Sequence, residues 1–125
     1  MRPYQALIAL WSLALVWGGL QAVWGHAFPQ RADPSAGATV AVAPALVRIW
    51  FDAALEPAFS SLRVQTARGQ PITQEEGQVD TGDATLLTIR LPPLAPGTYQ
   101  VLWSVVARDG HRTEGTYTFT VKQGP

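Results

Sequence analysis

Apolar side chains at every second position recur along this chain, and this spacing constrains its fold more than any other feature. The five segments that show it are 46–51, 61–66, 86–91, 98–106 and 115–121. Because residues two apart lie on the same side of a pleated strand, each segment is expected to bury one face. β-branched and aromatic residues are frequent in these segments, which favours strands. No helical stripe of apolar residues of useful length follows His26, so we expect an all-β domain.

Turn-forming residues separate these segments. Prolines and a glycine at 92–97 interrupt the chain between the third and fourth segments, where no helix continues. The stretches 33–37 and 77–83 are also expected to be loops. Several short strands without crossover helices predict an antiparallel Greek-key β-sandwich of about seven strands. The segment LAPGTY at 94–99 resembles the strand entry with a tyrosine corner of immunoglobulin-like domains.

The first 25 residues differ in composition from the rest of the chain. Residues 6–20 read ALIALWSLALVWGGL, an apolar run broken only by Ser12, and they follow a short polar start that carries Arg2. This order is typical of a secretory signal peptide, and the run is shorter than the roughly 20 residues that a membrane span needs. Val23 and Gly25 stand at the −3 and −1 positions of a suitable cleavage site.

Cleavage at this site would remove 1–25 and leave 26–125 as one exported domain that begins with His26. The expected location is the periplasm or another compartment outside the cytoplasm. Two alternatives stay open. Cleavage after Ala22 would leave His26 inside the chain, and an uncleaved leader would anchor the protein in the membrane.

Composition excludes several kinds of site. The chain has no cysteine, so disulfides, zinc–thiolate clusters, iron–sulfur clusters and thiol nucleophiles are ruled out. Nine basic and nine acidic residues give a formal net charge of zero, which provides no general attraction for nucleic acid. Removal of the leader would take away the only methionine, Met1.

The two histidines, His26 and His111, are the main candidates for chemistry. If the extended geometry of 98–106 continues, Asp109 and His111 point the same way, two residues apart. A terminal His26 would add its ring nitrogen and its α-amine, which together close a six-membered chelate ring on a metal. The donor set would then contain three nitrogens and one oxygen.

Such a set suits Cu(II), which prefers tetragonal nitrogen and oxygen sites and tops the affinity order of the divalent first-row metals. Cu(I) prefers sulfur ligands, and 26–125 contains neither Met nor Cys. Read singly, a histidine near a turn is typical of a solvated residue, and Asp-Gly is a common turn dipeptide. The joint pattern is what indicates a Cu(II) site.

The chain beyond the leader resembles the bacterial periplasmic copper-resistance family usually called CopC-like. The matching features are His26-Ala27, DPSAG at 33–37, Pro44, VRIWF at 47–51, LAPGTY at 94–99, WSVV at 103–106, DGH at 109–111 and GTYTF at 115–119. The resemblance covers essentially all of 26–125. The stretch 103–119, taken with the histidine after the leader, is its most specific part.

This resemblance implies a cupredoxin-like or immunoglobulin-like β-sandwich that binds Cu(II) through an N-terminal His, an Asp and a second His. These roles fall on His26, Asp109 and His111, with one Cu(II) ion per mature chain. It also implies a non-enzymatic copper carrier or buffer that delivers its ion to an inner-membrane copper transporter of the CopD-like type. The chain departs from members that have a Met- and His-rich Cu(I) loop, because 66–85 contains neither residue.

Two other functions stay open from the sequence. A copper-dependent oxygenase of the lytic polysaccharide type also holds copper with an N-terminal His and a second His. The short chain has few aromatic residues for a glycan-binding face, and a direct Asp ligand would occupy a position that oxygen chemistry needs open, so no polysaccharide partner is expected. A metal-free immunoglobulin-like interaction module would leave His26 and His111 without a metal role.

Overall fold

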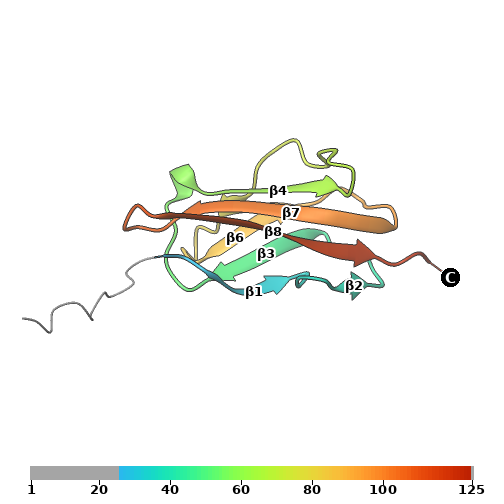
Figure 1. The fold of residues 1–125 in the computed structure, drawn as a ribbon, viewed down its shortest axis with the longest axis horizontal. Helices are drawn as coiled ribbons and strands as arrows, with labels where there is room; N and C mark the ends of the chain where they lie inside the picture. Colours follow the sequence, from blue (N-terminus) through green and yellow to red (C-terminus); the bar gives the residue numbers. More distant parts are fainter. Residues whose placement is uncertain (1–25, 125) are drawn as a thin grey trace, which may run out of the picture.

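The alternating segments form strands in the computed structural model, which describes residues 26–124 (Figure 1). The strands are β1 (Pro29–Asp33), β2 (Thr39–Val40), β3 (Leu46–Phe51), β4 (Ser61–Thr66), β5 (Gln78–Val79), β6 (Leu86–Arg90), β7 (Gly97–Val106) and β8 (Arg112–Val121), with one 3₁₀ turn, η2 (Pro57–Phe59). The expected signal peptide and its cleavage site lie outside the described residues. Between residues 26 and 124, no helix has the length and apolar character needed to cross a bilayer.

Five of these strands agree with the alternating segments. β3 and β4 have the predicted bounds, β6 and β7 differ by one residue at one end, and β8 begins three residues earlier than expected. β1, β2 and β5 were not predicted. β5 lies within 77–83, so the expectation of a loop there was wrong for its two strand residues. A two-residue strand contains no alternation that a sequence pattern can reveal.

The strands pack as a sandwich of two four-stranded sheets, in the orders β1-β3-β6-β5 and β2-β8-β7-β4. Figure 1 shows the two layers one above the other, with the long β7–β8 hairpin in the upper one. The expected antiparallel pairing holds except for β2, which pairs with β8 in parallel. The expected all-β sandwich is therefore confirmed, with one mixed sheet.

The core lies between the sheets and is filled by the alternating positions. Its largest fully buried side chains are Phe119, Ile49, Leu55, Leu62, Leu87, Val47, Val64, Val101 and Val105. Trp103 is only partly buried, and its ring meets Phe51 edge to face at 5.3 Å between centroids. Burial of this apolar surface is the main force that holds the sandwich together, because the chain has no disulfide to constrain it.

The tyrosine corner that the sequence suggested is present. The Tyr99 hydroxyl, at the start of β7, donates a hydrogen bond to the backbone carbonyl of Ala95, and its ring stacks on Phe119. This contact fixes the proline-rich connection between β6 and β7 against the start of β7, the strand with the longest apolar face.

Three segments far apart in the sequence meet at one end of the sandwich. They are the chain before β1, the loop after β3 and the turn between β7 and β8, all at the left of Figure 1. A backbone bridge between Leu55 and Ala107 joins the second to the third. The candidate residues lie at this end.

Candidate metal centre

The turn between β7 and β8 positions Asp109 and His111. The strand ends at Val106, and the chain reverses through Gly110, whose φ of +93° favours glycine. The Gly110 N–H donates to the Ala107 carbonyl at 2.9 Å, and the Ala107 N–H donates to the His111 carbonyl at 3.0 Å. The expectation that extended geometry continues to His111 was therefore wrong, because a turn intervenes.

The turn nevertheless brings the two side chains together. Oδ1 of Asp109 accepts the backbone N–H of His111 at 3.0 Å, and Oδ2 lies 2.7 Å from Nδ1 of the His111 ring. An aspartate that binds the backbone two residues ahead is a common turn device. Here the same carboxylate also orients an imidazole, so oxygen and nitrogen donors are held side by side.

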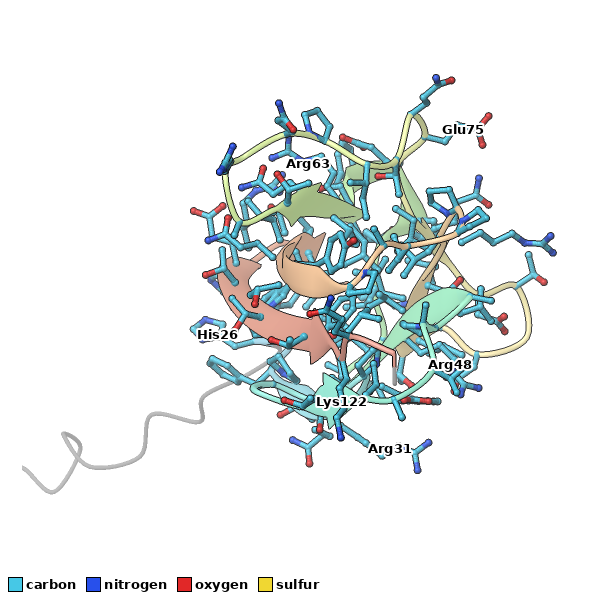
Figure 2. The ribbon with its side chains drawn as sticks, turned by 90° about the vertical axis from the view of Figure 1, so that its right-hand side faces the viewer. His26, Arg31, Arg48, Arg63, Glu75 and Lys122 are labelled. Atoms are coloured by element: carbon cyan, nitrogen blue, oxygen red, sulfur yellow. The ribbon has the colours of Figure 1, made fainter. Side chains whose placement is uncertain are left out.

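His26 lies against this pair. The ring centroids of His26 and His111 are 4.7 Å apart, with the rings near perpendicular at 74°. Figure 2 shows His26 at the surface of the molecule, beside the strand β8. Two residues separated by 85 positions in the sequence are therefore in contact, and all three predicted residues lie in one cluster.

The position of His26 is fixed by the two residues that follow it. The Ala27 side chain is fully buried in the core, and its carbonyl accepts a hydrogen bond from Oγ1 of Thr113 at 2.6 Å. The Phe28 N–H donates to Oδ1 of Asp52 at 2.7 Å, and the Asp52 N–H donates back to the Phe28 carbonyl at 3.0 Å. The chain before β1 is therefore held by β8, through Thr113, and by the loop after β3, through Asp52.

Sequence reasoning did not identify Ala27, Thr113 and Asp52 as parts of this cluster. Thr113 lies two residues after His111, and that spacing is the one signal that was available. Nothing in the sequence relates Asp52 to Phe28, because their contact depends on how β3 and β1 pair.

Asp109 supplies the carboxylate of the cluster. A hydrogen bond from the His111 backbone, followed in importance by one from its ring, holds the pKa of the Asp109 carboxyl below its ordinary value. The carboxylate is therefore ionised throughout the range in which imidazoles titrate. The His111 side chain is 61% exposed, so the cluster is open to solvent and not sealed in the core.

As they stand, the side chains of the described residues 26–124 form no group of three or more His, Cys, Asp or Glu that could hold a metal ion. The Asp109 carboxylate faces the His111 backbone and ring, and the two imidazoles meet edge to face. Ligation by all three residues would require the rings to turn about their side-chain torsions. The main chain of His26 supplies an additional nitrogen only if the chain begins there.

A second aspartate of the same local type serves as a reference. Oδ1 of Asp83 accepts the backbone N–H and the hydroxyl of Thr85, two residues ahead, at 2.9 and 2.6 Å. The side-chain and backbone hydrogen bonds from Thr85 lower the pKa of Asp83 too. No histidine accompanies it, because His26 and His111 are the two in the chain. An aspartate-capped turn is therefore a structural device that does not by itself indicate a metal.

The CopC domain family model matches residues 30–122 of the chain. Protein YobA of Escherichia coli K12 is 36% identical over 122 residues, which cover 97% of this chain and 96% of that protein. The crystal structure of CopC from Methylosinus trichosporium OB3b superposes with a TM-score of 0.75 at 37% identity, over 80% of this chain and 97% of that one. PcoC, described as a methionine-rich copper resistance protein from Escherichia coli, gives a TM-score of 0.67 at 29% identity, over 78% and 99%.

Proposed function

This chain belongs to the CopC family, and from that premise we propose that it is an exported copper-resistance protein that binds one Cu(II) ion per mature chain. In this proposal the chain acts as a carrier or buffer of copper and not as an enzyme. The ligands are the α-amine and ring of His26, the carboxylate of Asp109 and the ring of His111.

The observation that carries the proposal is the contact of His26 with the Asp109–His111 pair. Their rings are 4.7 Å apart, and the carboxylate oxygen is 2.7 Å from a ring nitrogen of His111. Two neighbouring ligands of a square-planar ion with bonds of about 2.0 Å are about 2.8 Å apart. The separation of oxygen and nitrogen in the pair is close to this value, so the two atoms could share an ion once the rings turn their nitrogen lone pairs towards it.

The exposure of the site supports exchange of the ion. A structural metal is usually enclosed by its ligands and by the core, whereas His111 is mostly exposed at the end of the sandwich. A partner protein can reach an ion held there without unfolding the domain. Delivery to an inner-membrane transporter of the CopD-like type is the role that we propose for this exposure.

The ligand set favours the cupric ion. Residues 26–125 contain no Met or Cys, and these are the ligands that Cu(I) prefers. The relative PcoC is described as methionine-rich, and this chain differs from it in that respect. The copper oxygenase and the metal-free module gain no support from the relatives, so we retain the carrier function alone.

Acidification is expected to weaken Cu(II) binding. Copper competes with protons for imidazole and amine nitrogens, whose pKa values in model peptides are about 6.5 and about 7.7–8.0. Asp109 adds nothing to this dependence near neutrality, because its lowered pKa keeps it ionised. Affinity should therefore fall at least about tenfold per pH unit below about pH 6. Competition titrations with a Cu(II) chelator of known pH dependence measure this directly, on exported protein whose N-terminus has been sequenced.

An affinity that is constant between pH 8 and pH 5.5 would contradict nitrogen ligation. Equal melting temperatures with and without one equivalent of Cu(II) would contradict binding altogether, because a ligand of the folded state raises its stability.

A further inference from the structure

A hydrogen bond links Thr113 to the chain beside His26, although Thr113 is not one of the proposed ligands. Its hydroxyl donates to the Ala27 carbonyl at 2.6 Å, across 86 positions of sequence. Thr113 is partly buried near the start of β8, two residues after His111. The peptide group that it holds is the one that links Ala27 to Phe28, adjacent to His26.

We propose that Thr113 is a positioning residue, whose hydroxyl sets the separation between His26 and His111. The inference rests on the proposed function in that the separation matters for copper. Thr113 is not one of the proposed ligands, and its hydroxyl would act through the Ala27 carbonyl.

The reason lies in how chain ends behave. The first residues of a domain are poorly ordered unless something ties them down. Three contacts tie this end: the buried Ala27 side chain, the Phe28–Asp52 pair and the Thr113 hydroxyl. Of these, the hydroxyl comes from β8, the strand that begins directly after His111, so its hydrogen bond connects residues 26–28 (the His26 arm) to the backbone next to the other imidazole.

Order in the arm affects affinity. If His26 is held beside His111 before the ion arrives, less conformational freedom is lost when copper binds. If the arm is loose, the same ligands must be gathered at the moment of binding. One neutral hydrogen bond is worth a factor of about two to ten in an equilibrium constant, and we expect the effect on Cu(II) affinity to fall in this range.

The test compares three variants of the exported, host-processed protein. Thr113→Val keeps the shape of the side chain and removes the hydroxyl, whereas Thr113→Ser keeps the hydroxyl. Thr120→Val is the matched control. It removes a threonine hydroxyl hydrogen bond from the same strand, to Thr98 at 3.0 Å, at the other end of β8. N-terminal sequencing verifies that each variant begins at the same residue.

The first readout needs no copper. Nuclear Overhauser effects between the ring protons of His26 and His111 should be present in the wild type, in Thr113→Ser and in Thr120→Val, and should weaken or disappear in Thr113→Val. The second readout is Cu(II) affinity, which should fall about two- to tenfold in Thr113→Val alone, with a change in the nitrogen hyperfine pattern of its paramagnetic resonance spectrum.

The outcomes separate the two proposals. If the wild type binds copper and Thr113→Val matches it in ring contacts, affinity and spectrum, the positioning role is wrong and the copper site stands. Equal losses in Thr113→Val and Thr120→Val would also overturn it, because the effect would then be one of general stability. If no variant binds copper but the ring contacts are lost in Thr113→Val alone, the positioning role stands and the proposed function fails.

Discussion

Replacement of His111 by alanine is expected to lower Cu(II) affinity by at least about 100-fold. Removal of a group that only orients a ligand typically costs ten- to a hundredfold in metal affinity, and removal of a ligand should cost more. The substitution should leave the fold intact, since His111 is mostly exposed and lies outside the core. Competition titration at pH 7.5 measures the loss, and thermal unfolding of the copper-free protein verifies the fold.

Aspartates at equivalent turns provide the control for this site. Asp109→Ala should also weaken Cu(II) binding strongly, since it removes the proposed oxygen ligand. Asp83→Ala removes a carboxylate that caps its own turn in the same way but binds Thr85 and neither histidine, and should leave copper affinity unchanged. Equal effects of the two substitutions, or none from His111→Ala, would contradict the assignment of these ligands.

Substitution of Gly77 by alanine is expected to destabilise the fold by about 2 kcal/mol. Gly77 is buried, and its N–H donates to the Leu62 carbonyl at 2.8 Å. A Cβ at this position would lie 2.5 Å from the Thr88 carbonyl oxygen and 2.7 Å from Cβ of Leu62. These two residues belong to opposite sheets, so neither can yield without moving a strand. For a domain of this size, the melting temperature should fall by roughly 10 °C.

The matched control for Gly77→Ala is Gly124→Ala, because a Cβ at Gly124 would meet nothing within 4 Å. Both changes reduce the freedom of the unfolded chain in the same way, so the difference between them reports the steric conflict. Thermal unfolding of the copper-free variants measures it. Equal melting temperatures for the two would show that the loop at Gly77 relaxes freely.

Much of the sandwich could be predicted from the sequence, because long strands in a two-layer fold carry a periodic signal. β3, β4 and β7 each bury alternate side chains, and a period of two is visible without the structure. β1 pairs with β3 along one edge but exposes most of its residues, and β2 and β5 are two residues long. These three strands are defined by backbone pairing with β3, β8 and β6, so their own sequences do not reveal them.

The structure brings together the three residues that the sequence proposed as ligands, but not in the expected geometry, and their role as ligands stays a prediction. The spacing of Asp109 and His111 suggested that they point the same way, and they do meet, but through a turn at Gly110 and not along a strand. The proximity of His26 depends on Ala27, Thr113 and Asp52, whose contacts are set by the tertiary fold. The spacing of Asp109 and His111 in the sequence indicated two candidate ligands, whereas the third candidate, His26, was proposed from the expected cleavage site.

The decisive comparison uses paramagnetic resonance of Cu(II) bound to the exported protein, with and without one additional residue ahead of His26. N-terminal sequencing of both samples must accompany it. If the cupric ion is held by the amino group and ring of a terminal His26, the added residue should abolish the nitrogen-rich spectrum and weaken binding at least about 100-fold. An identical spectrum and affinity in the two proteins would contradict the account, because the ion would then be bound without the chain terminus.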